Sequence, residues 1–160
     1  MSMLYTIKQS YIGRLCISAM SFIIHPMFPH HFDEVYALWQ SMEGVELNPS
    51  DDTPQAIAEF LSFNPGLNYI ASSENKVVGV VMCGFDGRRA TVYHLAVNPL
   101  YRRKGIASAL MSVLEKALQE KGVTKGRLLA FKTNEDATSF WQKEGWNLQP
   151  QLNYFSKNFS

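Results

Sequence analysis

The sequence predicts an α/β domain with a mixed, mostly antiparallel twisted sheet flanked by helices. The chain has 160 residues, of which 46% are hydrophobic, and this suits one folded domain with its own core. Short apolar runs typical of strands alternate with segments of helical periodicity. Their order is β-α-α-β-β-β-α-β-α-β, without repeats or low-complexity stretches. This order favours one α/β domain with a mixed sheet.

The first third of the chain predicts one strand and two helices. A short apolar run over residues 21–26 is the strand. Apolar side chains recur at helical spacing over residues 32–42, and Gly44 ends that helix. After a polar loop over residues 46–52, Asp52 or Thr53 caps a second helix that begins at Pro54.

The middle of the chain changes to a strand pattern. Three strands are expected, and turn signals at residues 73–75 and 86–87 separate them. They span residues 69–71, 77–85 and 91–97. A long amphipathic helix then begins at Ile106, and Gly122 stops it. The remaining elements are a strand, a short helix and a final strand, over residues 128–131, 137–141 and 152–155.

Composition and charge exclude several classes of protein. The 15 basic and 14 acidic residues nearly cancel, which argues against a nucleic-acid partner. No run approaches the roughly 18 apolar residues of a membrane span, so we expect no membrane partner. Two cysteines, Cys16 and Cys83, form no disulfide framework, and this favours a reducing compartment, the cytoplasm. The four histidines lack zinc-site spacing, so no metal is expected.

The segment before the long helix carries the chemistry. A helix start leaves several backbone N–H groups unpaired, with a partial positive charge, and this geometry binds phosphate. Gly105 and Ala107 would let a diphosphate approach the backbone, while Arg102, Arg103 and Lys104 add positive charge. The alternative is a solvated basic turn before an ordinary helix.

Two motifs in this sequence resemble those of the GNAT superfamily of N-acetyltransferases. Arg102-x-x-Gly105-x-Ala107, after Val97-x-Pro99, is similar to the family's acetyl-CoA motif. A second segment, from Asn134 to Trp146, resembles its other signature, a short helix that ends in Gly-aromatic. The whole is most similar to small bacterial RimI-like members of unassigned substrate. The resemblance starts near Ser21, so we expect residues 21–160 to be the N-acetyltransferase domain. Residues 1–20 would be an N-terminal extension, with the first 19 residues upstream of a natural start at Met20.

The resemblance implies that the chain transfers an acetyl group from acetyl-CoA, its co-substrate, to a primary amine. The acceptor would be a small molecule or a peptide, attacking directly in a ternary complex. The backbone of Leu95 and Val97 would pair with the pantetheine arm, and amides from Arg103 to Ala107 would take the pyrophosphate. Asn134 would contact CoA from the far side. The full set of implied CoA contacts is Leu95, Ala96, Val97, Arg102, Arg103, Lys104, Gly105, Ile106, Ala107, Ser108, Asn134 and Trp141.

Acetyl transfer needs a neutral amine and hence a base. Deprotonating a lysine-like amine of pKa about 10.4 at pH 7 costs about 4.6 kcal/mol, which a general base offsets. His94 is one candidate, because it lies beside the expected thioester and imidazoles titrate near neutrality. Regular alternation places it on the opposite face from Leu95, although a bulge would reverse this. Glu46, Asp51 and Asp52 are the other candidates, although the two aspartates are rather expected to cap the following helix.

The general acid is where this sequence departs from the family. Many members place a tyrosine just after the aromatic residue of the last helix, and here that position is Trp141. Indole N–H donates a hydrogen bond but does not deliver a proton. Tyr93 or Tyr154 could substitute, water could protonate the thiolate, or the thiolate could leave with weaker help. Trp141 itself would then serve only in packing.

Two other functions fit parts of the sequence. The missing tyrosine favours a CoA-binding regulatory or interaction module without turnover. The run from Arg102 to Lys104 would suit nucleic acid, against the balance of charge. The acidic loop from Glu46 to Asp52 suits a cationic amine as acceptor. Dimers are common in such domains, so a homodimer is compatible with the resemblance, although no residue pattern indicates one.

Overall fold

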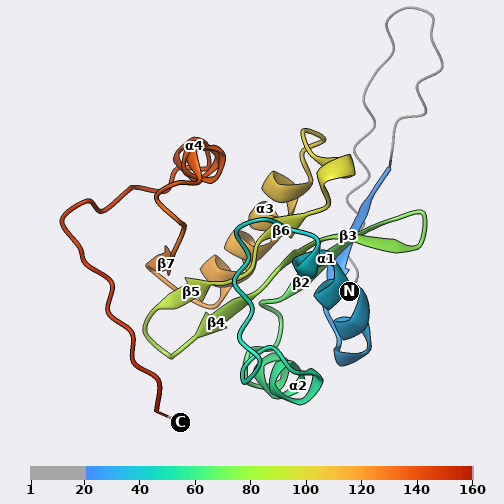
Figure 1. The fold of residues 1–160 in the computed structure, drawn as a ribbon, viewed down its shortest axis with the longest axis horizontal. Helices are drawn as coiled ribbons and strands as arrows, with labels where there is room; N and C mark the ends of the chain where they lie inside the picture. The colour runs from blue at the N-terminus through green and yellow to red at the C-terminus, as the bar shows by residue number, and fades with distance from the viewer. Residues whose placement is uncertain (1–20, 160) are drawn as a thin grey trace, which may run out of the picture. The chain divides into compact units, whose positions relative to one another are not determined.

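Residues 21–159 are described by the computed structural model, and they divide after Leu129 into two units. The predicted extension over residues 1–20, which includes Cys16 and the natural start expected at Met20, lies outside the described residues. The larger unit contains two sheets, and its helices lie on both sides of the strands (Figure 1). Among the described residues, no helix is long and apolar enough to cross a membrane.

The first sheet is antiparallel and has the order β1-β2-β3-β6. The second has the order β4-β5-β7, in which β5 and β7 run parallel. The strands of the first sheet are β1 (Ile23–Pro26), β2 (Tyr69–Ser73), β3 (Lys76–Val81) and β6 (Ala96–Val97). Those of the second are β4 (Cys83–Phe85), β5 (Ala90–Val92) and β7 (Gly126–Leu128).

Four α-helices and two 3₁₀ turns complete the described chain. They are η1 (Pro29–His31), α1 (Phe32–Gln40), α2 (Pro54–Phe63), η2 (Pro99–Tyr101), α3 (Ile106–Glu120) and α4 (Glu135–Lys143). The expected cap of α2 is Thr53, whose Oγ1 accepts the N–H of Ala56 at 3.1 Å. The predicted α/β fold class with a mostly antiparallel sheet is therefore confirmed, and all four predicted helices are present.

The two long strands predicted in the middle of the chain are each broken into two. Residues 77–85 become β3 and β4, and residues 91–97 become β5 and β6. The pairs Val80–Ala96 and Cys83–Val92 show why. Along the chain, Cys83 follows Val80 by three residues, whereas Ala96 follows Val92 by four. One extra residue between Val92 and Ala96 is a β-bulge, which disrupts the ladder locally and bends the strand.

The bulge changes which way side chains point. Tyr93 packs edge-on against Phe60 of α2, with ring centroids 5.7 Å apart. The next residue, His94, lies against Trp39 of α1 at 4.7 Å. Consecutive residues of a regular strand point to opposite faces, so contact of both with the α1–α2 layer requires the irregularity. Regular alternation, the expectation from sequence, is therefore interrupted at this position.

Apolar layers on the two faces of the first sheet hold the larger unit together. On one face, α1 and α2 bury a cluster that includes Val35, Trp39 and Val80. On the other face, α3 lies against Gly79, and an added Cβ there would stand 3.0 Å from Ile106 Cγ2 and 3.2 Å from Leu110 Cδ1. A glycine at this position therefore lets α3 approach β3 closely.

The smaller unit, residues 130–159, contains α4 and an irregular tail. The final strand predicted over residues 152–155 is wrong, because residues 152–159 carry no helix or strand. A strand needs a neighbouring backbone to pair with, and Pro150 removes one donor just before this segment. Its apolar side chains are exposed, as in Leu152 and Phe155. Apolar alternation alone therefore did not specify a strand here.

We predict that Gly79→Val lowers the free energy of unfolding by about 1–3 kcal/mol, because the new side chain overpacks the contact between β3 and α3. Urea denaturation measures the change. The control Lys76→Ala, on an exposed residue of the same strand, should stay within about 0.5 kcal/mol of the parent. Equal stability of the Gly79 variant and the parent would contradict the close approach of α3.

Candidate functional site

The turn that leads into α3 has an unusual backbone. Arg103 has a φ of 59° and Gly105 a φ of 79°, so two nearby residues adopt the left-handed conformation. A Cβ on Gly105 would meet nothing within 4 Å. Glycine is therefore favoured there by its conformation, and the space beside its Cα is open. The N–H of Ala109 donates to Gly105 O at 3.0 Å, which is the first hydrogen bond of the α-helical ladder. The backbone amides just before Ala109 therefore precede that ladder.

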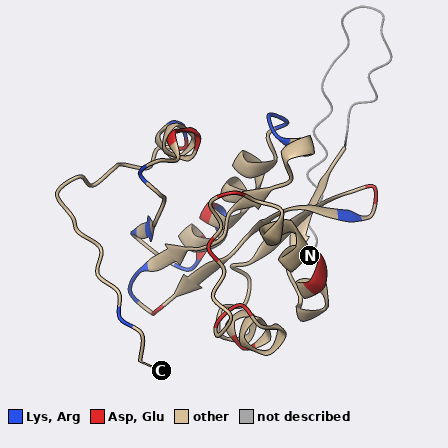
Figure 2. Cartoon of the chain, viewed as in Figure 1, with Lys and Arg blue, Asp and Glu red and all other residues tan. Residues whose placement is uncertain are grey.

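Positive charge gathers on this turn, as Figure 2 shows for the loop that precedes α3. Arg102, Arg103 and Lys104 are all exposed. The Arg102 guanidinium donates to Met42 Sδ at 3.8 Å, which links the turn to the chain after α1. Lys104 Nζ lies 5.7 Å from the centre of the Tyr101 ring. Cationic side chains and the positive end of a helix dipole together favour an anion at this place.

The strand before the turn presents an open edge. β6 is an edge strand, paired on one side with β3. The N–H of Asn98 donates to Val78 O at 2.8 Å, so the backbone groups of Asn98 and, two residues earlier, Ala96 face β3. By the alternation of an antiparallel ladder, the N–H and C=O of Leu95 and Val97 face away from β3. An extended chain laid along that edge would find backbone partners there.

His94 forms a polar cluster with the loop between α1 and α2. Its Nε2 lies 3.4 Å from Asp52 Oδ1, and the side chains are 24% and 8% exposed respectively. The other carboxylate oxygen, Oδ2, accepts the N–H of Asn48 at 2.7 Å. Trp39 is fully buried beneath the imidazole, and its Nε1 has no partner among the described residues. Packing therefore holds the indole, and hydrogen bonding holds the carboxylate.

The other candidates for proton transfer are less enclosed. Glu46 is exposed on the loop. Asp51 is exposed and accepts from Asn48 Nδ2 at 3.0 Å, so it belongs to the turn of this loop. Tyr93 is 48% exposed beside Phe60. The structure thus brings Asp52 to His94, and places Glu46 on the same loop without a contact to that imidazole among the interactions described.

Three of the predicted residues belong to the smaller unit. Asn134 caps α4, since its Oδ1 accepts the N–H of Ala137 at 2.9 Å. Trp141 lies edge-on to both Phe140 and Trp146, at 5.0 and 5.5 Å. Tyr154 is 70% exposed on the tail. Within this unit, Trp141 takes part in an aromatic packing group, and Asn134 has a structural role in addition to any contact with CoA.

The sequence predicts Asp52 or Thr53 as the cap of α2 and gives no signal for Trp39. The cap is Thr53, which leaves the Asp52 carboxylate available to His94. Both partners are distant from His94 in sequence and come from different elements, so no local spacing indicates them. The adjacent Asp51–Asp52 pair was the available signal, because one helix needs only one cap.

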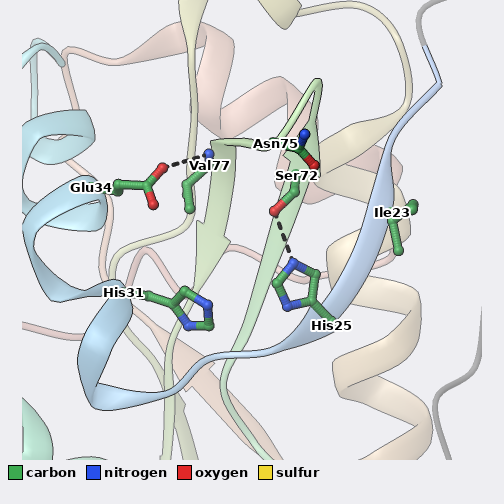
Figure 3. A pocket seen from close by; sticks show the side chains of 7 residues that line it. All are labelled: Ile23, His25, His31, Glu34, Ser72, Asn75 and Val77. Carbon is green, nitrogen blue, oxygen red and sulfur yellow. Dashed lines mark hydrogen bonds between the residues drawn. The ribbon is translucent and has the colours of Figure 1, made fainter.

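A separate cavity of about 310 Å³ opens between β1, the β2–β3 hairpin and the start of α1 (Figure 3). None of the predicted site residues lines it. His25 Nε2 lies 2.8 Å from Ser72 Oγ, and the carboxylate of Glu34 accepts the N–H of Val77 at 3.0 Å. Burial, then the neighbouring His30 and His25, lower the pKa of His31. The described residues include no group of three or more side chains suited to hold a metal ion.

Among the described residues, Cys83 is the one cysteine, and it is fully buried, as expected from its apolar run. Burial raises the pKa of its thiol to about 11. The thiolate is the reactive form of cysteine, so this residue is unsuited to act as a nucleophile near neutral pH. A covalent acyl-enzyme on Cys83 is therefore disfavoured.

Comparison with known proteins places these features in a family. Residues 32–146 match the profile of the Acetyltransferase (GNAT) family. Acetyltransferase SG1711 from Sodalis glossinidius is 36% identical over 121 residues, which are 76% of this chain and 84% of that protein. This match is both close enough and long enough to show common ancestry.

Solved structures share the fold at lower identity. One is AAC(6')-Iy, an aminoglycoside N-acetyltransferase, in complex with the bisubstrate analogue CoA-S-monomethyl-acetylneamine. It aligns with a TM-score of 0.69 at 16% identity, over 86% of this chain and 98% of that one. Another is the ribosomal-protein-S18-alanine N-acetyltransferase from Escherichia coli, with a TM-score of 0.66 at 20% identity, over 79% and 77%.

We predict that Cys83 resists alkylation in the folded protein. In a Cys16→Ser variant at about pH 8, iodoacetamide should modify Cys83 at least about 100-fold more slowly than in denaturant, because burial suppresses its thiolate. Mass spectrometry measures the modified fraction with time. Comparable rates in the folded and denatured protein would show that the thiol is accessible and would reopen covalent catalysis.

Proposed function

The chain belongs to the Acetyltransferase (GNAT) family and is an acetyl-CoA-dependent N-acetyltransferase, and from this premise we propose that a primary amine attacks the thioester directly in a ternary complex. The observation that carries the proposal is the succession, along one segment, of His94, the open edge of β6 and the left-handed turn into α3. A base, a channel for an extended arm and an anion site then follow one another in order.

The donor would lie along β6. The outward C=O of Leu95 and the outward backbone groups of Val97 pair with the amides of pantetheine, and Ala96 between them faces the core. The diphosphate sits at the start of α3, on amides from Arg103 to Ala107. Arg102, Arg103 and Lys104 surround it, with Gly105, Ile106, Ala107 and Ser108 supplying the helix start. From the smaller unit, Asn134 and Trp141 remain proposed contacts.

The acceptor would be a cationic amine. The loop between α1 and α2 carries Glu43 and Glu46, both exposed, and Figure 2 marks the acidic residues of this segment in red. An ammonium group is attracted to such a loop before it loses its proton. Among similar structures, AAC(6')-Iy holds an analogue of an aminoglycoside, which is polycationic, and this supports the same class of acceptor here.

His94 would remove the proton that blocks attack. One proton passes from the ammonium to the imidazole, and the amine nitrogen then bonds to the carbonyl carbon. The N–H of Leu95 donates to the developing oxyanion. The C–S bond breaks with its electron pair going to sulfur, and the second amine proton goes to that sulfur through Tyr93 or water. The products are an amide and CoA as the thiol. We place this reaction in the cytoplasm, where a buried free thiol such as Cys83 remains reduced.

We predict that Gly105→Glu weakens CoA binding by at least about 100-fold. A non-glycine residue in the left-handed region costs about 1–2 kcal/mol, and the carboxylate repels the diphosphate. Isothermal titration calorimetry with CoA measures the dissociation constant. Ser112→Glu adds the same charge to an exposed position of α3 away from its start and should bind normally. Retained affinity in Gly105→Glu would contradict the diphosphate assignment.

The experiment that tests the proposed function is an acetyl-transfer screen. Purified protein and acetyl-CoA are combined with polyamines, aminoglycosides, amino acids and peptides with free N-termini. Thiol release and the mass of the acetylated product are followed. Polycationic amines should be the best acceptors. Tight CoA binding without any acetylated amine would contradict catalysis and favour the regulatory module.

With an acceptor in hand, the base can be assigned. His94→Gln should lower kcat by about 10²–10⁴-fold, the usual contribution of a general base, with CoA affinity unchanged. Glu46→Gln should raise KM for the amine and change kcat little, because Glu46 is exposed on the loop that attracts the cation. The reverse pattern would identify Glu46 as the base.

A further inference from the structure

The contact between Asp52 and His94 is more enclosed than a chance surface pair. The Asp52 side chain is 8% exposed, and its two oxygens have different partners. Oδ2 accepts the backbone N–H of Asn48 at 2.7 Å, which fixes the carboxylate to its own loop. Oδ1 lies 3.4 Å from His94 Nε2. The carboxylate is thus held by the backbone on one side and directed to the imidazole on the other.

The imidazole is also confined by its neighbours. Trp39 lies beneath it at 4.7 Å between ring centroids, and the indole is fully buried. The β-bulge directs His94 toward α1. The loop that carries Asp52 runs from α1 to α2, and both helices pack on the same core. Three separate parts of the chain therefore fix the ring: the bulge, the indole and the carboxylate.

We propose that Asp52 is a positioning residue that holds His94 in the tautomer protonated at Nε2. A carboxylate only accepts, so a hydrogen bond between the two groups forms only when Nε2 carries the proton. Nδ1 is then the basic nitrogen. This inference rests on the proposed function, in which Nδ1 takes one proton from the ammonium and the ring becomes imidazolium. The Asp52 carboxylate stabilises that cation and does not itself touch substrate.

The tautomer assigns a direction to the chemistry. Protonation at Nδ1 instead would leave the lone pair on Nε2, facing the carboxylate and unable to reach the amine. Asp52→Asn removes the negative charge and keeps the shape of the side chain. Its amide oxygen would still accept the N–H of Asn48, so its amide N–H would face Nε2 and the ring should change to the Nδ1–H tautomer. An Asp→Asn change thus separates orientation from packing.

Nuclear magnetic resonance of ¹⁵N-histidine-labelled protein tests the proposal at about pH 8.5, where an ordinary imidazole of pKa about 6.5 is neutral. A His94→Gln spectrum assigns the His94 signals. The parent protein should show the Nε2–H tautomer, and Asp52→Asn should show the Nδ1–H tautomer. Asp52→Glu should keep the parent tautomer, since a carboxylate remains. Asp33→Asn, an exposed carboxylate on α1, is the matched control and should change nothing.

Kinetics supply the second readout. With the best acceptor from the screen, Asp52→Asn should lower kcat by about 10–100-fold while KM for acetyl-CoA stays the same. Asp52→Glu should recover most of that loss. A purely structural role would lower the folded fraction of both variants alike and leave the tautomer of the folded protein unchanged.

The outcomes separate the two claims. An Nδ1–H tautomer in the parent, or the Nε2–H tautomer retained in Asp52→Asn with normal kcat, overturns the role of Asp52. If no amine is acetylated by the parent, the proposed function is overturned, and the tautomer measurement still decides whether Asp52 orients the ring. If Asp52→Asn does not fold, Asp52→Ala removes the carboxylate instead: kcat should fall by about 10–100-fold at unchanged KM for acetyl-CoA, and an unchanged kcat overturns the role of Asp52.

Discussion

One extra residue between Val92 and Ala96 is the constraint on which the site depends. It divides two long strands into β3–β4 and β5–β6 and ends the pairing of β5 before β6 begins. It also leaves β6 with an unpaired edge in its sheet and directs His94 to α1. Without it, regular alternation would turn either Tyr93 or His94 away from the α1–α2 layer. A single insertion in the ladder therefore creates both the open edge of β6 and the orientation of His94, the proposed channel and the proposed base.

The helix that follows completes the site by electrostatics. The protein as a whole is nearly neutral, with a formal charge of +1, so attraction of CoA depends on local charge and not on net charge. That local charge comes from Arg102, Arg103 and Lys104, exposed on a turn whose backbone ends in a left-handed glycine. The close approach of α3 to Gly79 anchors the start of this helix to the same sheet that carries β6.

Local features were predictable from the sequence, and features that depend on distant partners were not. The helices, and the turn at Gly105, follow from periodicity and punctuation within a few residues. The bulge has no compositional signature, since residues 91–97 contain neither glycine nor proline. Asp52 meets His94 only because α1 and α2 fold over the sheet. The tail over residues 152–155 alternates like a strand, but pairing and not alternation makes a strand, and Pro150 lies just before it.

In the proposed mechanism, the tryptophan at position 141 matters less for the reaction than the environment of His94. At pH 7, deprotonating a lysine-like amine of pKa about 10.4 costs about 4.6 kcal/mol. Leaving a thiol of pKa about 8.5 as its thiolate costs only about 2 kcal/mol. The base therefore faces the larger obstacle, and a weak acid suffices at sulfur. In the proposed mechanism, a chain that lacks the usual tyrosine still needs an oriented imidazole, and the carboxylate of Asp52, the indole of Trp39 and the bulge all contact or direct the ring of His94.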